Sequence, residues 1–139
     1  MALSPAALDA EPLLRGLRIV IVEDDTDSRE MLDELLSFYG ADVQTAADAA
    51  AGISTLARFK PAVLLSDIGL PGEDGFSMMR RCRKLATAEA RVPAIAVTAF
   101  CREQDRAECF AAGFDDYAPK PLDVSDLVQR ILRVVGRAN

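Results

Sequence analysis

The sequence predicts an α/β fold in which helices cover both faces of a parallel β-sheet. Five short, mostly apolar runs alternate with five segments of helical periodicity, and the connections between them are short. Two of the runs, 17–22 (LRIVIV) and 62–66 (AVLLS), are apolar almost throughout, which is typical of strands buried on both faces. Repetition of strand and helix with short connections favours parallel strands joined by crossover helices.

Each element has its own signal along the chain. Strand 17–22 leads through the acidic loop 23–27, where Asp27 is an expected helix cap, into a helix that Gly40 ends. Gly or Pro also closes several of the later helices. The other strands are expected at 41–45, 62–66, 93–97 and 115–118, and the other helices at 47–59, 76–85, 103–112 and 123–135.

Length and composition limit the classes of function. The 139 residues are expected to form one domain, 16–139, after an N-terminal extension or linker, 1–15. No apolar run is long enough to cross a membrane, and residues 1–11 lack the basic start and apolar centre of a secretory signal. We therefore expect a cytoplasmic protein without a membrane partner. A net charge of −6 argues against direct nucleic-acid binding.

The residue types that are missing are also informative. The chain has no histidine, which excludes histidine triads, histidine metal sites and a phosphohistidine made within this chain. Its three cysteines, Cys82, Cys101 and Cys109, form no C-x-x-C pair and are expected to be reduced thiols. A phosphohistidine donor, if one acts here, must belong to another protein.

Polar side chains follow four of the five expected strands. Glu23 and Asp24 follow the first strand and Asp67 follows the third. Thr98 follows the fourth strand, and Lys120 comes after the fifth. Open parallel sheets bind ligands at the carboxyl ends of their strands, so we expect these five side chains to meet in one crevice.

Asp67 is the expected centre of this crevice, because it lies between a buried strand and a turn rich in Gly and Pro. An aspartate carboxylate can act as a nucleophile that accepts a phosphoryl group. Three neighbouring carboxylates repel one another unless they share a cation, and oxygen ligands without His or Cys favour Mg²⁺, with Mn²⁺ as the alternative. Lys120 would pair with Asp67 or with phosphoryl oxygens, to which Thr98 could donate a hydrogen bond.

Four motifs make the chain resemble the receiver domain of bacterial two-component response regulators. They are IVIVEDD at the first strand, LLSDIGLPGEDG at the third, IAVTAF at the fourth and DDYAPKPL at the fifth. The resemblance covers about residues 16–136. It implies a flavodoxin-like doubly wound five-stranded parallel sheet, (βα)5, with strand order 2-1-3-4-5. Pro119 in the fifth expected strand agrees with the edge position that this order gives.

The resemblance implies that Asp67 is the phosphoacceptor. It also implies that Glu23 and Asp24 form the acidic pair of a metal site, with Asp24 the more direct ligand. Together with Asp67 itself, the backbone carbonyl of Gly69 would complete the protein ligands of Mg²⁺.

The resemblance further implies a switch at the ends of the last two strands. Thr98 would be the switch hydroxyl and Lys120 the lysine that pairs with the phosphoryl group. Tyr117 matches the aromatic ring that rotates when Thr98 moves toward the phosphate. A cis peptide is implied at Lys120–Pro121, since cis bonds are mainly a proline feature.

The implied function is a phosphoacceptor switch and not an enzyme acting on other substrates. A histidine kinase or histidine phosphotransfer protein would transfer the phosphoryl group to Asp67 with Mg²⁺ present. The face formed by the last two helices and the fifth strand would then change its preference for a downstream protein. The motifs are also similar to hybrid-kinase receivers, which favours a receiver from a hybrid kinase over a stand-alone regulator.

Three other functions stay open on the residues alone. A Mg²⁺-dependent phosphohydrolase usually needs a second acid two residues after its nucleophile, where this chain has Gly69. A flavin- or nucleotide-binding domain would have a first loop rich in Gly, Ser or Thr, whereas 23–25 is acidic. The third is a receiver-like interaction module that phosphorylation does not regulate.

Gly69 and the large Phe100 depart from what many relatives of the resembled family carry beside the phosphoryl group.

Several charged residues outside the crevice are expected to face solvent. Asp74, Asp115 and Asp116 are predicted to lie in exposed turns. Arg130, Arg133 and Arg137 are predicted to form a solvated face of the last helix, with a contribution to a partner interface as the alternative.

Overall fold

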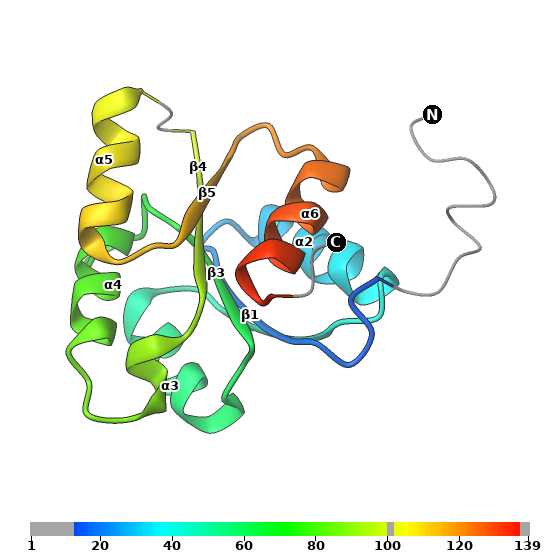
Figure 1. The fold of residues 1–139 in the computed structure, drawn as a ribbon, viewed down its shortest axis with the longest axis horizontal. Helices are drawn as coiled ribbons and strands as arrows, with labels where there is room; N and C mark the ends of the chain where they lie inside the picture. The colour runs from blue at the N-terminus through cyan, green and yellow to red at the C-terminus, as the bar shows by residue number, and fades with distance from the viewer. Residues whose placement is uncertain (1–12, 100–101, 137–139) are drawn as a thin grey trace.

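The computed structural model describes residues 13–99 and 102–136. Over these ranges the chain forms a five-stranded parallel sheet with helices on both faces (Figure 1). The strands are β1 (Arg18–Val22), β2 (Asp42–Ala46), β3 (Val63–Asp67), β4 (Ala94–Thr98) and β5 (Asp116–Pro119). The helices are α2 (Thr26–Phe38), α3 (Ala49–Phe59), α4 (Gly75–Arg83), α5 (Glu103–Ala112) and α6 (Val124–Val134), with a 3-10 turn, η1 (Ala88–Arg91), that was not predicted. The order β2-β1-β3-β4-β5 confirms the expected topology and places Pro119 in an edge strand.

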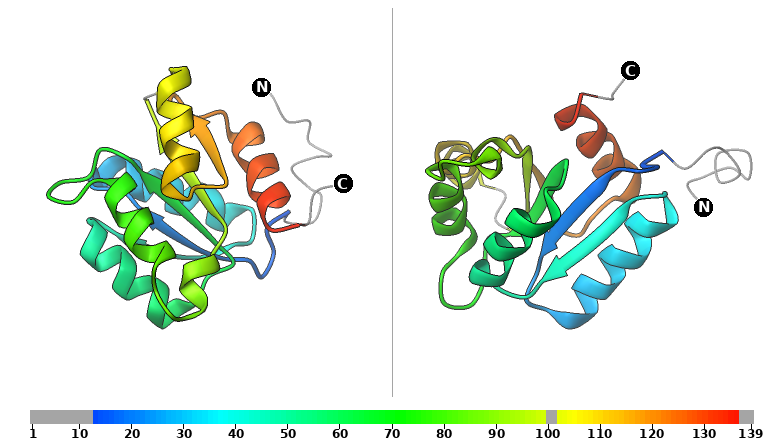
Figure 2. Two further views of the ribbon diagram at one scale, coloured as in Figure 1. Left: turned by 60° about the vertical axis from the view of Figure 1, so that its left-hand side comes forward. Right: turned by 90° about the horizontal axis from the view of Figure 1, so that it is seen from below.

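Alternation along the strands divides the core into two halves. In β1, Ile19 and Ile21 pack with buried residues of α2 and α6. Val20 and Val22 pack with buried residues of α3, α4 and α5 on the opposite face. Figure 2 shows these two layers of helices on either side of the sheet. Because both faces of β1 are covered beyond its first residue, Arg18, the strand is apolar from Ile19 to Val22.

Aspartate side chains cap the N-termini of α2, α3, α4 and α6. The Asp25 carboxylate accepts a hydrogen bond from the Ser28 N–H at 2.9 Å and caps α2, so the prediction of Asp27 as the cap was wrong. Asp74 caps α4 in the same way through the Ser77 N–H at 2.8 Å. Each carboxylate satisfies a backbone donor that the first helical turn leaves without an intrahelical partner.

Residues 13–16 form a turn that joins the start of the described chain to the core. The Leu14 side chain is fully buried, and its N–H donates to the Tyr39 carbonyl oxygen at 2.8 Å. The turn therefore packs against the end of α2. The boundary predicted between residues 15 and 16 stays a prediction, and residues 1–12 lie outside the described ranges.

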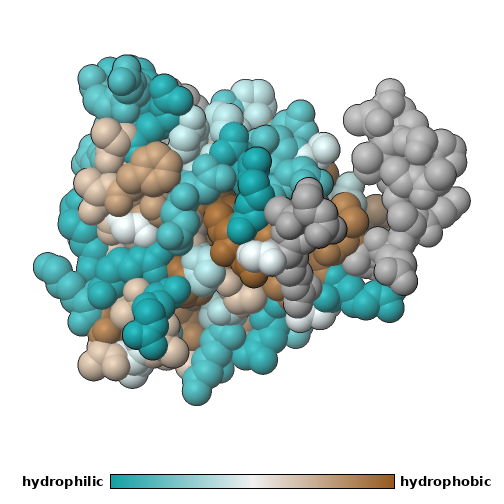
Figure 3. All heavy atoms as spheres, in the orientation of Figure 1, coloured by the Kyte–Doolittle hydropathy of each residue, from teal (hydrophilic) through white to brown (hydrophobic). Residues whose placement is uncertain are grey.

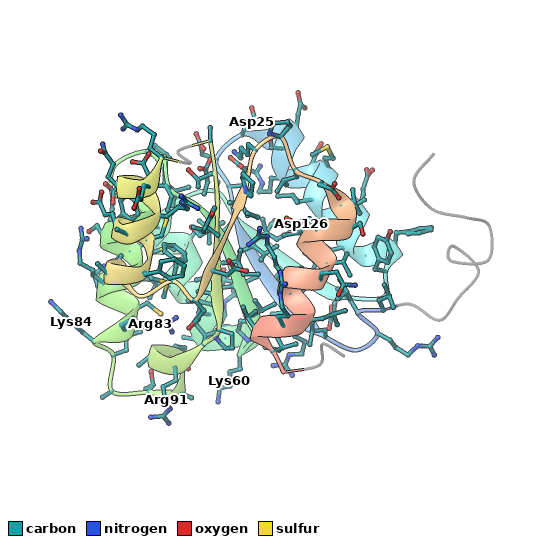
Figure 4. The ribbon with its side chains drawn as sticks, turned by 45° about the horizontal axis from the view of Figure 1, so that its top comes forward. Asp25, Lys60, Arg83, Lys84, Arg91 and Asp126 are labelled. Atoms are coloured by element: carbon teal, nitrogen blue, oxygen red, sulfur yellow. The ribbon has the colours of Figure 1, made fainter. Side chains whose placement is uncertain are left out.

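Arg83 ties together the end of the sheet remote from the strand carboxyl termini. Its guanidinium donates to the carbonyl oxygens of Gly113 at 2.7 Å and Val92 at 2.6 Å, and to Asp115 at 3.1 Å. Asp115 also accepts from the Ala94 N–H at 2.9 Å, so this exposed carboxylate holds the start of β4. Arg83, Lys84, Arg91 and Lys60 lie on the same side of the molecule in Figure 4, away from Asp25.

The surface is mostly hydrophilic on the face drawn in Figure 3, with hydrophobic surface over α5, where Phe110 is half exposed. Among the helices of residues 13–99 and 102–136, none has the length and apolar character that crossing a membrane requires.

Candidate functional site

Strand register brings the predicted residues to one edge of the sheet. Val22, the last residue of β1, is paired with Ser66, and Asp67, the last residue of β3, is paired with Val97. Thr98 then ends β4. Asp67 and Thr98 thus belong to their strands rather than following them, and the sheet itself fixes their backbones.

Three carboxylates meet at this edge. One oxygen each from Glu23, Asp24 and Asp67 lies within 4.8 Å of the others. The Glu23 side chain is 3% exposed and that of Asp67 is 14% exposed, whereas Asp24 is exposed to solvent. The structure therefore gathers the three carboxylates that the sequence predicted, with one of them open to an approaching ligand.

Lys120 supplies a positive charge to this cluster. Its N–H donates to the Thr98 carbonyl oxygen at 2.9 Å, which fixes the backbone where β5 ends. Its Nζ lies 3.2 Å from Oε1 of Glu23 and 3.2 Å from Oδ2 of Asp67. The peptide between Lys120 and Pro121 is cis, as the resemblance implied. One ammonium group therefore bridges the carboxylates of two different strand ends.

Burial and charge act together on the titration of the site. Burial raises the pKa of Glu23 above its ordinary value; the Asp25 N–H opposes this shift and the negative charge of Asp67 adds to it. Burial alone would lower the pKa of Lys120, but the Asp67 and Glu23 carboxylates raise it above its ordinary value. Lys120 is therefore an ammonium ion at neutral pH.

The donor set fits a hard divalent cation. Three carboxylates face one ammonium group, so negative charge stays in excess, and the clustered ligand atoms are all oxygens. Such oxygens suit Mg²⁺, and a bound dication would reduce the repulsion between the carboxylates. The Gly69 N–H donates to Oδ1 of Asp67 at 3.2 Å, which orients this carboxylate. A ligand role for the Gly69 carbonyl oxygen stays a prediction.

The two predicted switch residues lie on neighbouring strands: Thr98 ends β4, and Tyr117 is paired with Ala96 two residues earlier in that strand. Thr98 is fully buried. Tyr117, in β5, is partly buried, and its hydroxyl accepts a hydrogen bond from Nη1 of Arg106 at 2.9 Å. Phe100, and Arg137 of the predicted solvated face, lie outside the described residues.

Two arginines flank the ring of Tyr117, and one of them was predicted to be solvated. The guanidinium of Arg106 in α5 lies 5.6 Å from the ring centroid, and that of Arg130 in α6 lies 5.4 Å from it. Arg130 also forms ion pairs with Asp116 at 2.8 Å and Asp126 at 2.7 Å, and its side chain is 20% exposed. The predictions that Arg130 and Asp116 are simply solvated were therefore wrong. These contacts join α5, β5 and α6 around one aromatic ring.

A groove of about 330 Å³ adjoins the carboxylates. Glu23 and Lys120 form part of its wall, together with Ser28, Met31 and Leu32 of α2 and with Pro121 and Leu122. The Met31 side chain is 55% exposed. An apolar surface thus lies directly beside the charged site.

Sequence reasoning missed Arg29, which reaches from α2 to the acidic loop. Its Nη1 donates to the carbonyl oxygen of Glu23 at 2.9 Å and to that of Asp24 at 3.3 Å. Nothing in the local pattern distinguishes this arginine from a solvated one. The Asp25 cap, in contrast, could have been found from its position three residues before Ser28.

Residues 19–132 match the family model of the response regulator receiver domain. Among curated proteins, the chain is 40% identical over 118 residues to an uncharacterized 14.6 kDa protein of Leptolyngbya boryana, covering 85% of this chain and 89% of that protein. It is 32% identical over 143 residues to hybrid signal transduction histidine kinase D of Dictyostelium discoideum, covering 98% of this chain but only 9% of the kinase. The chain also spans 52% of response regulator MprA of Mycobacterium leprae, at 35% identity over 121 residues and 87% of this chain.

Solved structures agree with these matches. A putative response regulator from Chloroflexus aurantiacus has a TM-score of 0.81 and 30% identity, covering 87% of this chain and 98% of that one. The receiver domain of a sensor histidine kinase from Pseudomonas aeruginosa, with a magnesium ion in its active site cleft, has a TM-score of 0.80 and 32% identity, with the same coverage. The site geometry, the strand order and the family match lead to one conclusion: the chain belongs to the response regulator receiver domains of two-component phosphorelay systems.

Proposed function

We propose that this domain accepts a phosphoryl group on Asp67 in a Mg²⁺-dependent reaction and thereby switches a partner surface. The observation that carries the proposal is the bridging of Asp67 and Glu23 by Lys120, with Asp24 beside them. This arrangement combines a nucleophilic carboxylate, ligands for a cation and a fixed positive charge for an incoming anion.

In the proposed reaction an oxygen of Asp67 attacks the phosphorus atom of the donor. A new P–O bond forms as the bond from phosphorus to the leaving group breaks, and the leaving group takes the bonding electron pair. Mg²⁺, or Mn²⁺ in its place, held by Glu23, Asp24, Asp67 and the Gly69 carbonyl, would neutralise charge during transfer. Lys120 would hold a phosphoryl oxygen, and Thr98 would donate to another.

The donor in this proposal is a histidine kinase or a histidine phosphotransfer protein, because the chain itself has no histidine. The groove lined by Met31 and Leu122 offers an apolar surface for packing of such a donor beside Lys120, whose ammonium group contacts Asp67. A cytoplasmic location is part of the same proposal.

The proposed output surface is formed by α5, β5 and α6. Movement of Thr98 toward the phosphoryl group would alter the packing around Tyr117, whose ring contacts Arg106 and Arg130 on the two flanking helices. A downstream protein that binds this surface would then read the phosphorylation state. We do not propose activity on other phosphate esters, because Gly69 supplies no acid to protonate a leaving group.

The experiment is incubation with acetyl phosphate and Mg²⁺, followed by intact-protein mass spectrometry. We expect the mass of one phosphoryl group to be added to the wild type and not to Asp67→Asn. Asp33→Asn is the control, because it removes a carboxylate on α2 that accepts a hydrogen bond from Ser37 and is not one of the clustered carboxylates. This variant should be modified like the wild type. Equal modification of wild type and Asp67→Asn, or modification that persists when EDTA removes Mg²⁺, would overturn the proposal.

A further inference from the structure

The acidic pair lies on the short connection between β1 and α2, where the hydrogen bonding of the sheet ends. The Glu23 N–H donates to the Ala46 carbonyl oxygen at 3.0 Å, and this bond is the last that links the connection to β2. The α2 helix begins three residues later, at Thr26. The carbonyl groups of Glu23 and Asp24 therefore lie between the end of a strand and the start of a helix, where regular structure gives them no partner.

Arg29 supplies that partner from within α2. Its Nη1 donates to both carbonyl oxygens, at 2.9 Å for Glu23 and 3.3 Å for Asp24, and Nη2 lies 3.5 Å from Oγ1 of Thr26. A guanidinium group is well suited to this task, because it presents several donors in a rigid plane. A single side chain thus spans the connection from end to end.

A second set of bonds closes the connection from its other side. The Asp25 N–H donates to Oε2 of Glu23 at 3.1 Å, and the Asp25 carboxylate caps α2 through Ser28. The Arg29 N–H in turn donates to the Asp25 carbonyl oxygen at 2.9 Å. With both peptide groups restrained, the directions in which the Glu23 and Asp24 side chains leave the backbone are fixed.

We propose that Arg29 is a positioning residue for the cation site, which holds the two carboxylates in the arrangement that a divalent cation requires. This inference rests on the proposed function of the site. Arg29 acts through the backbone of the ligands and does not itself contact the cation.

Two physical effects of Arg29 on cation binding have opposite signs. Its positive charge repels a dication, so charge alone predicts that removal of Arg29 tightens Mg²⁺ binding. Its hydrogen bonds hold the ligands in place, so positioning predicts that removal weakens binding. Loss of groups that orient metal ligands typically lowers metal affinity by about tenfold to a hundredfold. The sign of the change therefore identifies the dominant effect.

The experiment is calorimetric titration of Mg²⁺ into the full chain. We expect Arg29→Ala to weaken binding by about tenfold, and Arg29→Lys to restore the affinity only in part, because a lysine keeps the charge but loses the planar donors. Arg133→Ala removes the same charge from an exposed position on α6 and should leave the affinity unchanged. Alanine is a good helix former, and the Asp25 cap remains, so α2 should persist; circular dichroism checks this.

The outcomes separate this inference from the function on which it rests. If wild type and Asp24→Asn take up Mg²⁺ equally, the cation site itself is refuted. If wild type binds at the site and Arg29→Ala binds as tightly or more tightly, only the positioning role is refuted. The two-dimensional ¹H–¹⁵N spectrum gives an independent readout: in Arg29→Ala the Asp25 amide signal should shift before any Mg²⁺ is added, since its partner Glu23 is released.

Discussion

Lys120 Nζ lies 3.2 Å from Oδ2 of Asp67, although the two residues are far apart in the sequence. Asp67 ends β3 and Lys120 directly follows β5, and these two strands are not neighbours in the sheet. The contact forms because both strands end at the same edge and because Lys120 is fixed by its N–H bond to Thr98 of the strand between them. This geometry makes the ammonium a substitute for part of the charge that a bound cation would supply.

The first prediction concerns the positive charge of Lys120. Lys120→Met keeps the length of the side chain but removes its charge, so Mg²⁺ should bind more tightly, on the order of tenfold, because no ammonium repels it. Phosphorylation by acetyl phosphate should nevertheless become slower, because the phosphoryl oxygens lose their countercharge. Calorimetry measures the Mg²⁺ affinity, and intact-protein mass spectrometry over time measures the rate of phosphorylation. Lys84→Met serves as the control, because Lys84 is the C-cap of α4, at the end of that helix away from Gly75 and Asp67. Unchanged Mg²⁺ affinity in Lys120→Met would contradict the argument.

The second prediction concerns the switch. The chain has no tryptophan and only two tyrosines, so Tyr39→Phe leaves Tyr117 as its only strong fluorophore above 280 nm. In that background, saturating beryllofluoride with Mg²⁺ should change the emission of Tyr117. The reason is that movement of Thr98 would alter the contacts of the ring with Arg106 and Arg130. Thr98→Val keeps the shape of the buried side chain but removes the hydroxyl, and should suppress the response. An identical emission change with and without Thr98→Val would show that the response of Tyr117 does not depend on the Thr98 hydroxyl.

The sequence was sufficient for the strands and for the core of the site. Buried parallel strands require apolar residues on both faces, and this requirement places runs such as 62–66 within one residue of β3. Because parallel strands share a carboxyl edge, the residues that end them are brought together whatever the details of packing. Glu23, Asp67 and Lys120 could therefore be predicted as neighbours, whereas the strand order came only from the resemblance.

The arginine contacts could not be predicted, for a physical reason. Arg29 and Arg83 bind backbone carbonyl groups, which every residue carries and which leave no pattern in the sequence. A helix shows the same spacing of arginines whether their guanidinium groups are solvated or paired. The surroundings of Tyr117 escaped for the same reason, since its partners Arg106 and Arg130 lie on two different helices.

The third prediction compares two glycines beside Asp67. A Cβ atom on Gly75 would lie 2.4 Å from the Asp67 carbonyl oxygen and 2.9 Å from Cα of Ile68, and backbone atoms cannot easily move away. We expect Gly75→Ala to lower the free energy of unfolding by about 1–3 kcal/mol, although helix propensity alone would favour alanine.

Gly69→Ala is the matched control, because beyond Gly69 itself and its two chain neighbours no atom lies within 4 Å of its added Cβ. Its stability should change by less than about 0.5 kcal/mol. Urea denaturation measures both variants. A Gly75→Ala protein as stable as Gly69→Ala would show that α4 does not pack tightly on the backbone of Asp67.

The last prediction concerns pH. The Cys82 side chain is fully buried, its thiol donates to the Glu89 carbonyl oxygen at 3.2 Å, and burial raises its pKa above the ordinary value of 9.0. The thiol therefore stabilises the fold fully below pH 9, and this contribution is lost as pH rises toward the folded-state pKa, because only the unfolded chain then ionises. Cys82→Ala should be less stable than wild type by about 1–2 kcal/mol at pH 7, and the difference should shrink by pH 10. Urea denaturation of both proteins at pH 7 and pH 10 tests this. Ionisation of Cys109 contributes equally to both proteins and so does not affect the difference in their free energies of unfolding. A stability difference that grows with pH would contradict the prediction.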